Sequence, residues 1–194
     1  MNNLIEEMRK YAVINHVPII TDGGLNYLEE YIKKHNIKNI LEVGTAIGYS
    51  AICMCNIDSD ITVTTIERDE ARYLEAVKNI KKGNLEDRIE LIFGDALEVN
   101  LEDKYDLIFI DAAKAQNEKF FERFEINLKD NGTIITDNMN FHGLVFKSDA
   151  EIESRNLRQL VRKVRNYKEF LISNPKYETL FLDIGDGLAV SVKK

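Results

Sequence analysis

Proline and glycine are scarce in this chain of 194 residues, which contains two prolines and ten glycines. No Pro/Gly/Ser-rich linker, repeat or low-complexity segment divides it, so we expect one domain over residues 1–194. No run approaches the roughly twenty apolar residues that a membrane-spanning helix needs. Residues 1–10 contain two glutamates and lack the apolar core of a signal peptide. These absences predict a folded cytoplasmic protein that has no membrane partner.

Cysteine is also rare, and acidic residues outnumber basic ones. Cys53 and Cys55 lie two positions apart in a predicted helix, where their side chains face different ways. A disulfide or a shared metal is therefore not expected, and both thiols are interpreted as reduced. The net charge of −7 argues against indiscriminate nucleic-acid binding, which needs a broad basic surface, but it leaves room for a local basic patch.

Apolar runs and helical periodicities alternate along the chain, as in a doubly wound α/β sheet. Helices are predicted at 2–13, 23–35, 47–56, 69–82, 115–128 and 152–173. Strands are predicted at 38–43, 61–67, 89–93, 105–110, 132–137, 177–184 and 187–192. Continuously apolar strands such as 107–110 are typical of a parallel sheet covered by helices on both faces. Gly185-Asp186-Gly187 is a hairpin signal, so we expect the sheet to end in an antiparallel pair.

Residues with distinctive chemistry follow the carboxyl ends of the predicted strands. They are Gly44, Gly48, Glu67, Asp95, Asp111, Asp137 and Asn138. In a doubly wound sheet these ends converge on one crevice, where ligands bind. The coincidence of so many special residues at one edge predicts a single active site there.

The glycine turn at 44–48 favours a nucleoside-containing cofactor without a pyrophosphate. A dinucleotide needs a G-x-G-x-x-G turn, whereas Ala46 occupies the position of the second glycine here. S-adenosylmethionine tolerates such a turn. Glu67 is then placed to accept hydrogen bonds from ribose hydroxyls, and Asp95 from the adenine amino group. The alternative interpretation is a turn that merely begins a helix.

Asp111, Asp137 and Asn138 form a second group, whose hard oxygen ligands suit Mg²⁺. A cation there lowers the pKa of a ligated hydroxyl and so creates a nucleophile. Lys114 could add positive charge or act as a general base. The alternative is that both aspartates only cap the helices that follow them.

Five motifs together resemble the cation-dependent class I O-methyltransferases, the family of catechol and caffeoyl-CoA O-methyltransferases. They are Glu42–Ser50, Ile66–Arg68, Gly94–Ala96, Phe109–Lys114 and Thr136–Asn138. The resemblance implies a Rossmann-like, seven-stranded, mostly parallel sheet with an antiparallel last strand, N-terminal helices over the active site at 1–36, and a homodimer. It implies a set of residues that bind S-adenosylmethionine, namely Glu42, Gly44, Gly48, Ser50, Glu67, Asp95, Ala96 and Asp111. It also implies that Asp111, Asp137 and Asn138 bind Mg²⁺, and that Lys114 and Asp111 are catalytic.

Four further segments resemble the bacterial tRNA 5-hydroxyuridine methyltransferases within that family. They are His16–Ile19, Phe141–Val145, Arg155–Arg158 and Ile184–Ala189. This branch implies methylation of the 5-hydroxyl of a modified wobble uridine in the anticodon loop, which gives 5-methoxyuridine. Small catechol-type or phenolic acceptors are the alternative within the enzyme class. A non-catalytic RNA-binding module is the alternative outside it.

An arginine stripe gives the tRNA hypothesis physical support. Arg155, Arg158, Arg162 and Arg165 are spaced three, four and three residues apart, so they share one face of a helix. Such a stripe on an acidic protein could hold RNA phosphates. An ion-paired surface or a dimer contact would produce the same pattern, so these alternatives stay open.

Overall fold

The computed structural model describes residues 2–194, which form six α-helices, seven strands and four short 3-10 turns. The helices are α1 (Asn2–Ile14), α2 (Asp22–Lys34), α3 (Tyr49–Cys55), α4 (Glu70–Lys82), α5 (Asn117–Phe124) and α6 (Arg155–Ser173). The strands are β1 (Asn39–Val43), β2 (Thr62–Glu67), β3 (Ile89–Phe93), β4 (Tyr105–Ile110), β5 (Leu128–Thr136), β6 (Tyr177–Leu182) and β7 (Leu188–Lys193). No helix within residues 2–194 is both long enough and apolar enough to cross a membrane.

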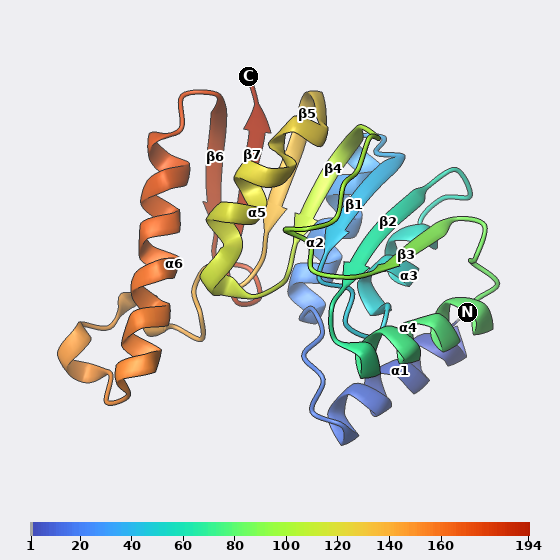
Figure 1. Ribbon diagram of the computed structural model, residues 1–194, viewed down its shortest axis with the longest axis horizontal. Coiled ribbons are helices and arrows are strands. Elements are labelled where there is room, and N and C mark those ends of the chain that lie inside the picture. The colour runs from blue at the N-terminus through green and yellow to red at the C-terminus, as the bar shows by residue number, and fades with distance from the viewer. Residues whose placement is uncertain (1) are drawn as a thin grey trace.

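All seven strands belong to one sheet, in the order β3-β2-β1-β4-β5-β7-β6. Strands β1 to β5 are parallel, and β7 runs antiparallel to both of its neighbours. Figure 1 shows β7 inserted between β5 and β6 and pointing the opposite way. The expected mostly parallel, doubly wound α/β sheet with an antiparallel last strand is confirmed.

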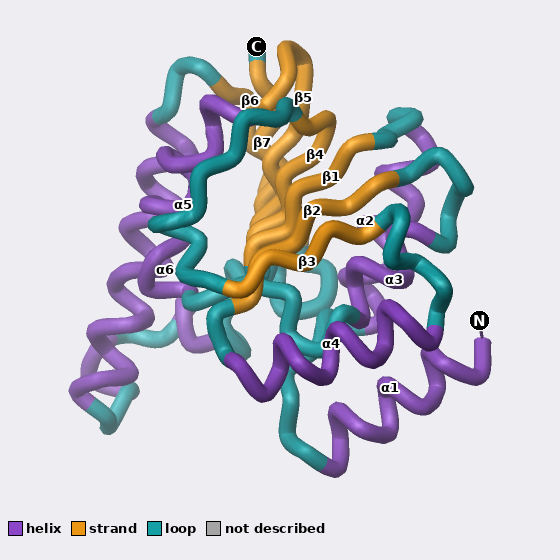
Figure 2. Tube along the Cα trace, turned by 45° about the vertical axis from the view of Figure 1, so that its right-hand side comes forward, coloured by secondary structure: helices purple, strands orange, loops and turns teal. Residues whose placement is uncertain are grey.

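Helices cover both faces of the sheet, because alternate strand residues point to opposite sides. Ile40, Leu107 and Phe109 lie in a core cluster with residues of α1, α2 and α3. Ile108 and Ile110 lie in a second cluster with the aromatic side chains of α5 and α6. Figure 2 shows these two layers, with α5 and α6 on one side of the sheet and the other four helices opposite. Both cores leave the carboxyl edge of the parallel strands open for a site.

Three predicted elements differ most from the observed ones, and two of them follow one another in the chain. The predicted helix 115–128 is broken, because Lys114–Gln116 and Glu125–Asn127 form 3-10 turns on either side of α5. Strand β5 therefore begins at Leu128 rather than at 132, and its pairing with β4 shifts register between Tyr105 and Leu107.

The predicted helix 152–173 begins later than expected, at Arg155. The Ser154 side chain accepts a hydrogen bond from the Leu157 amide and so caps the first turn. A separate 3-10 turn at Asp149–Glu151 precedes this cap. The connection from β5 to α6 is therefore longer than the sequence pattern indicated, and it becomes a wall of the site.

Candidate active site

Two adjoining cavities open at the carboxyl edge of the sheet. The first is lined by Gly44, Ser50, Glu67, Asp95, Ala96 and Asp111, among others. The second is lined by Asp137, Asn140, His142, Phe146, Asp183 and Asp186, among others. Pro18, Ile19, Lys114 and Asn138 line both. The two cavities therefore meet beside the Lys114 amine and the Asn138 amide, beneath the segment that joins α1 to α2.

The conformation of the glycine turn is imposed by the backbone that follows the neighbouring strand β4. Gly44 has φ +101°, and a Cβ built there would lie 2.2 Å from the Asp111 carbonyl oxygen. Only glycine allows this approach, because the obstructing atom is backbone and the dihedral disfavours L side chains. The turn that follows β1 is therefore pressed against Asp111, the residue that follows β4.

Ala46 and Glu67 hold the turn together. Ala46 adopts a left-handed conformation with φ 48°, and its amide donates to Glu67 Oε2 at 2.8 Å. Glu67 Oε1 accepts from the amides of Arg68 and Asp69 at 2.9 and 2.8 Å. The carboxylate thus fixes both loops that border the first cavity. The backbone conformation that favours glycine at position 46 is present, although the residue is alanine.

Asp111, Asp137 and Asn138 come together as the sequence predicted. Asn138 Nδ2 donates to Asp111 Oδ1 at 3.0 Å, and the Asn138 amide donates to Asp137 Oδ1 at 2.6 Å. Asn138 has φ 64°, a conformation that asparagine tolerates and that turns its side chain toward Asp111. The amide oxygen of Asn138 and one oxygen of each carboxyl group remain available as ligands.

The electrostatics of this trio favour a bound cation. Burial and the neighbouring Asp111 carboxyl group together raise the pKa of Asp137 to about 7. Burial also raises the pKa of Asp111, while Lys114 and the Asn138 hydrogen bond oppose that shift. The residues fit a hard divalent cation, which would relieve the repulsion between two desolvated carboxylates. Among residues 2–194 no cluster of three His, Cys, Asp or Glu side chains could hold a metal, so this site depends on the asparagine.

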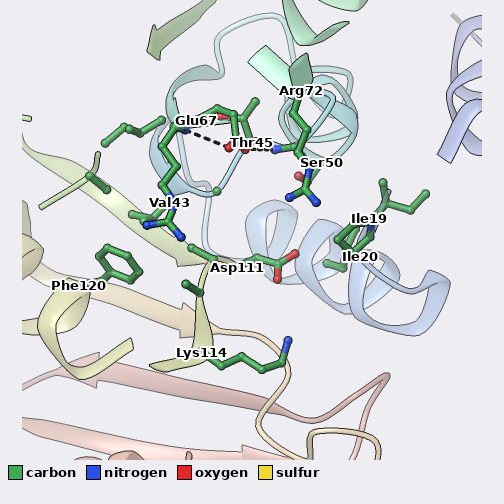
Figure 3. Close-up of a pocket in the computed structure, with 18 of the residues that line it drawn as sticks. Ile19, Ile20, Val43, Thr45, Ser50, Glu67, Arg72, Asp111, Lys114 and Phe120 are labelled. Atoms are coloured by element: carbon green, nitrogen blue, oxygen red, sulfur yellow. Dashed lines mark hydrogen bonds between the residues drawn. The ribbon is translucent and has the colours of Figure 1, made fainter. Parts of the chain in front are cut away.

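Lys114 stands at the junction of the two cavities. It begins the 3-10 turn that follows β4, and its Nζ lies 5.4 Å from the Phe141 ring centroid. Figure 3 shows its side chain extending into the space that the Asp111 carboxyl group also faces. An ammonium group there can stabilise negative charge that develops on an oxygen between the cavities.

The model of the O-methyltransferase family matches residues 1–194. The chain belongs to the O-methyltransferase family. A caffeoyl-CoA O-methyltransferase of Populus kitakamiensis is 27% identical over 190 residues, with 94% of this chain and 80% of the relative covered. A Staphylococcus aureus protein, provisionally named a caffeoyl-CoA O-methyltransferase, has a solved structure with TM-score 0.93 and 47% identity, covering 98% of this chain and 92% of that one. A Bacillus cereus O-methyltransferase in complex with SAH has TM-score 0.84 and 28% identity, covering 99% and 91%.

Family membership makes this chain an S-adenosylmethionine-dependent O-methyltransferase. Its predicted cofactor residues Gly44, Ser50, Glu67 and Ala96 all line the first cavity. Asp95 lines it too, and its Oδ1 accepts from the Leu97 amide at 2.9 Å. Whether each of these side chains contacts the methyl donor stays a prediction. Of the two cavities, the first contains the glycine turn, so it is where the methyl donor is predicted to bind, and it is called the donor cavity below.

Glu42 and Gly48 are predicted cofactor residues that do not line the donor cavity of the methyltransferase. Gly48 caps the start of α3 with φ 84°. Glu42 has no exposed surface, and it accepts hydrogen bonds from the hydroxyls of Ser50 and Thr65, the latter at 2.5 Å. Burial raises the pKa of Glu42 to about 8, and Asp111 and Glu67 contribute. Glu42 does not line the cavity itself, and its link to the cavity is its hydrogen bond with Ser50, which does.

Asp186 is a site residue that sequence reasoning missed. Its Oδ1 accepts from the His142 amide at 2.5 Å, while its buried Oδ2 has no hydrogen-bond partner within the described chain. The hairpin that carries it packs tightly, since a Cβ on Gly187 would lie 2.5 Å from Asn140 Cγ. The sequence does contain a pattern that indicates this position. Because β7 is antiparallel to β5, the hairpin before β7 must lie at the edge of the sheet where β5 ends.

The arginine stripe of the methyltransferase is largely engaged within the protein. Arg162 and Arg165 both pair with Asp149, at 2.5 and 2.9 Å. Arg158 Nη1 donates to the Ile152 carbonyl at 2.6 Å. Arg155 is exposed. The alternative of an ion-paired face thus describes two of the four, and the predicted contact with RNA phosphates is not tested by this geometry.

Proposed function

We propose that this methyltransferase is Mg²⁺-dependent and methylates the 5-hydroxyl of 5-hydroxyuridine at the wobble position of tRNA, giving 5-methoxyuridine. The observation that carries the proposal is the meeting of the two cavities at Lys114 and Asn138. A donor in the first cavity and an acceptor ring in the second would then face each other beside Asp111 and Asp137. We also propose that the enzyme is a homodimer.

The chemistry needs an acceptor oxygen that carries negative charge next to the donor. A bound divalent cation supplies Lewis acidity, which lowers the pKa of a ligated hydroxyl. Asp111, Asp137 and the Asn138 amide oxygen are the groups that would hold it. Lys114 would take the hydroxyl proton or balance the oxyanion charge. Since methyl transfer is an in-line displacement, the main task of the protein is to hold the two reactants in register.

A 5-hydroxyuridine suits this site because its ring hydroxyl is enol-like and acidic enough to ionise on a cation. RNA-modifying enzymes reach bases that are unstacked in loops, as in an anticodon loop. Three exposed cations, Lys147, Arg155 and Arg162, lie in the chain segment that follows the second-cavity residues His142 and Phe146. They could hold RNA phosphates even on a protein whose net charge is −7.

A small catechol-type or phenolic acceptor would use the same chemistry and needs none of the exposed cations. A non-catalytic RNA-binding module is the remaining alternative, and the intact set of Asp111, Lys114, Asp137 and Asn138 counts against it. A binding module has no need of two adjoining buried carboxyl groups; burial raises the pKa of both, and the Asp111 carboxyl group adds to the shift of Asp137.

The test is methyl transfer by the purified protein to tRNA that contains 5-hydroxyuridine, with a catechol assayed in parallel. Activity on tRNA should require Mg²⁺, disappear with a chelator and disappear in the Asp111→Ala variant. Asp103→Ala, which removes an exposed aspartate outside both cavities, is the matched control and should stay active. Activity that a chelator leaves unchanged would contradict the metal role. Transfer to the catechol alone would contradict the tRNA acceptor.

A further inference from the structure

The loop between β5 and α6 holds one large apolar side chain out toward the second cavity. Its Phe146 is 72% exposed and lines the second cavity together with Lys114 and Asp137. Burying a phenylalanine side chain stabilises a protein by about 1.5–3 kcal/mol. The fold forgoes that gain here and leaves the ring accessible at a cavity wall.

The backbone on both sides of Phe146 is held by one guanidinium group. Arg165 Nε donates to the Val145 carbonyl at 3.1 Å, and Arg165 Nη2 donates to the Lys147 carbonyl. Asp149, in the same loop, pairs with Arg165 at 2.9 Å and so orients it. Charge-assisted hydrogen bonds of this kind are stronger and shorter than neutral ones. Arg165 therefore fixes the peptide segment that presents Phe146.

The Phe146 ring itself is also held. Lys168 Nζ lies 5.3 Å from the ring centroid, and it lies 5.7 Å from the Phe181 centroid. The same amine lies 3.4 Å from Asn140 Oδ1, close to the limit for a hydrogen bond. A cation over one face of an aromatic ring is attracted to it and so restrains the ring, and the 72% exposure of Phe146 leaves much of the side chain accessible. The result is an ordered, exposed aromatic surface at the mouth of the second cavity.

We propose that the exposed ring of Phe146 stacks on the ring of the methyl acceptor and holds that ring flat while its hydroxyl faces Lys114. Phe146 is then a specificity-determining residue for a planar, base-like acceptor, and Arg165 with Asp149 are positioning residues that act through it. Stacking of a base on an aromatic side chain contributes about 1–3 kcal/mol, roughly 5- to 150-fold in affinity. The chemical class of the acceptor rests on the proposed function, whereas the stacking contact does not depend on tRNA.

The first experiment compares three substitutions of Phe146. Phe146→Ala and Phe146→Leu should raise the KM for hydroxyuridine-containing tRNA by roughly 5- to 150-fold, because neither side chain offers an aromatic face. Phe146→Tyr should stay close to wild type. The KM for S-adenosylmethionine should not change in any of them. Ile172→Ala removes an equally exposed apolar side chain from α6, at 72% exposure, and should have no effect.

The second experiment asks whether Arg165 acts through Phe146. Arg165→Met should raise the acceptor KM, and this effect should largely vanish when Phe146 is already alanine. A double-mutant cycle measures this coupling, which a merely structural role for Arg165 would not produce. Equal effects of Arg165→Met in both backgrounds would overturn the positioning role. An unchanged acceptor KM in Phe146→Ala would overturn the stacking contact itself.

The outcomes separate this inference from the proposed function. If wild type methylates tRNA with Mg²⁺ and Phe146→Ala does so with the same KM, only the stacking contact is wrong. If wild type methylates only a catechol, the tRNA acceptor is wrong, and the same three variants test stacking on that ring. If neither acceptor is methylated, equilibrium binding of the 5-hydroxyuridine nucleoside decides. Weaker binding to Phe146→Ala than to wild type would support the contact, and equal binding would overturn it.

Discussion

Replacing Glu42 by glutamine should change how the stability of the protein depends on pH. Glu42 is fully buried, and its oxygens accept hydrogen bonds from Ser50 and Thr65, so no exposed surface is left for water. None of the groups that shift its pKa is a cation, and the nearby Asp111 and Glu67 raise it further. The native protein therefore keeps Glu42 protonated at pH values where the unfolded chain has released that proton.

The sign and size follow from linkage. Because the native state binds the extra proton, the free energy of unfolding falls as pH rises through the window between the ordinary pKa of 4.5 and the raised value of about 8. The slope approaches about 1.4 kcal/mol per pH unit, and the whole window corresponds to about 5 kcal/mol at most. Water that enters on ionisation reduces this, so about 2–3.5 kcal/mol is expected between pH 5 and 8.

Glu42→Gln removes the titration and keeps the hydrogen bonds. The Gln amide can accept from one hydroxyl and donate to the other, since Thr65 can instead donate to Thr45, 2.6 Å away. Urea unfolding from pH 5 to 9 in EDTA should show wild type losing stability relative to Glu42→Gln as pH rises. Glu90→Gln, on the edge strand β3 and exposed, is the control and should parallel wild type. Parallel curves for wild type and Glu42→Gln would refute the reasoning.

Three further predictions concern the turn, the cation and the RNA. Gly44→Ala should lower the free energy of unfolding in urea by more than about 3 kcal/mol, because the added Cβ would meet backbone at 2.2 Å. Gly143→Ala is the control. Its Cβ would meet nothing within 4 Å, so this variant should lose only about 1 kcal/mol, the cost of a left-handed conformation. At ten times its dissociation constant, Mg²⁺ should stabilise wild type by about 1.4 kcal/mol at pH 8, but not Asp137→Asn. Arg155→Gln should weaken tRNA binding and lower its salt slope by about one.

Each of these has an outcome that contradicts it. Equal losses for the two glycine variants would mean that the approach to Asp111 is not the constraint on Gly44. The same Mg²⁺ shift in Asp137→Asn would place the cation elsewhere. A salt slope that Arg155→Gln leaves unchanged, measured by titration at several salt concentrations, would remove Arg155 from the RNA contact.

The sheet could be predicted because its signals are local and mutually consistent. Apolar runs such as 107–110 define strands buried on both faces, and the hairpin at 185–187 predicted the antiparallel end correctly. The errors came where backbone geometry depends on neighbours. Strand β5 begins early because Leu128 pairs with Tyr105 across a register shift, which no local pattern encodes.

The site shows the same division. Asp111, Asp137 and Asn138 were predicted as a group because strand ends converge, and the structure brings them together. The placement of Glu42 behind Ser50 depends on which face of β1 it occupies and on the packing of α3. The engagement of Arg162 and Arg165 depends on Asp149, whose loop position is not visible in the helical spacing.

Nucleoside analysis of tRNA from cells that lack this protein tests the central claim most directly. The proposed function predicts that 5-methoxyuridine disappears, that 5-hydroxyuridine accumulates, and that wild-type protein restores methylation while Asp111→Ala does not. Unchanged 5-methoxyuridine in those cells, or its full restoration by Asp111→Ala, would contradict the claim.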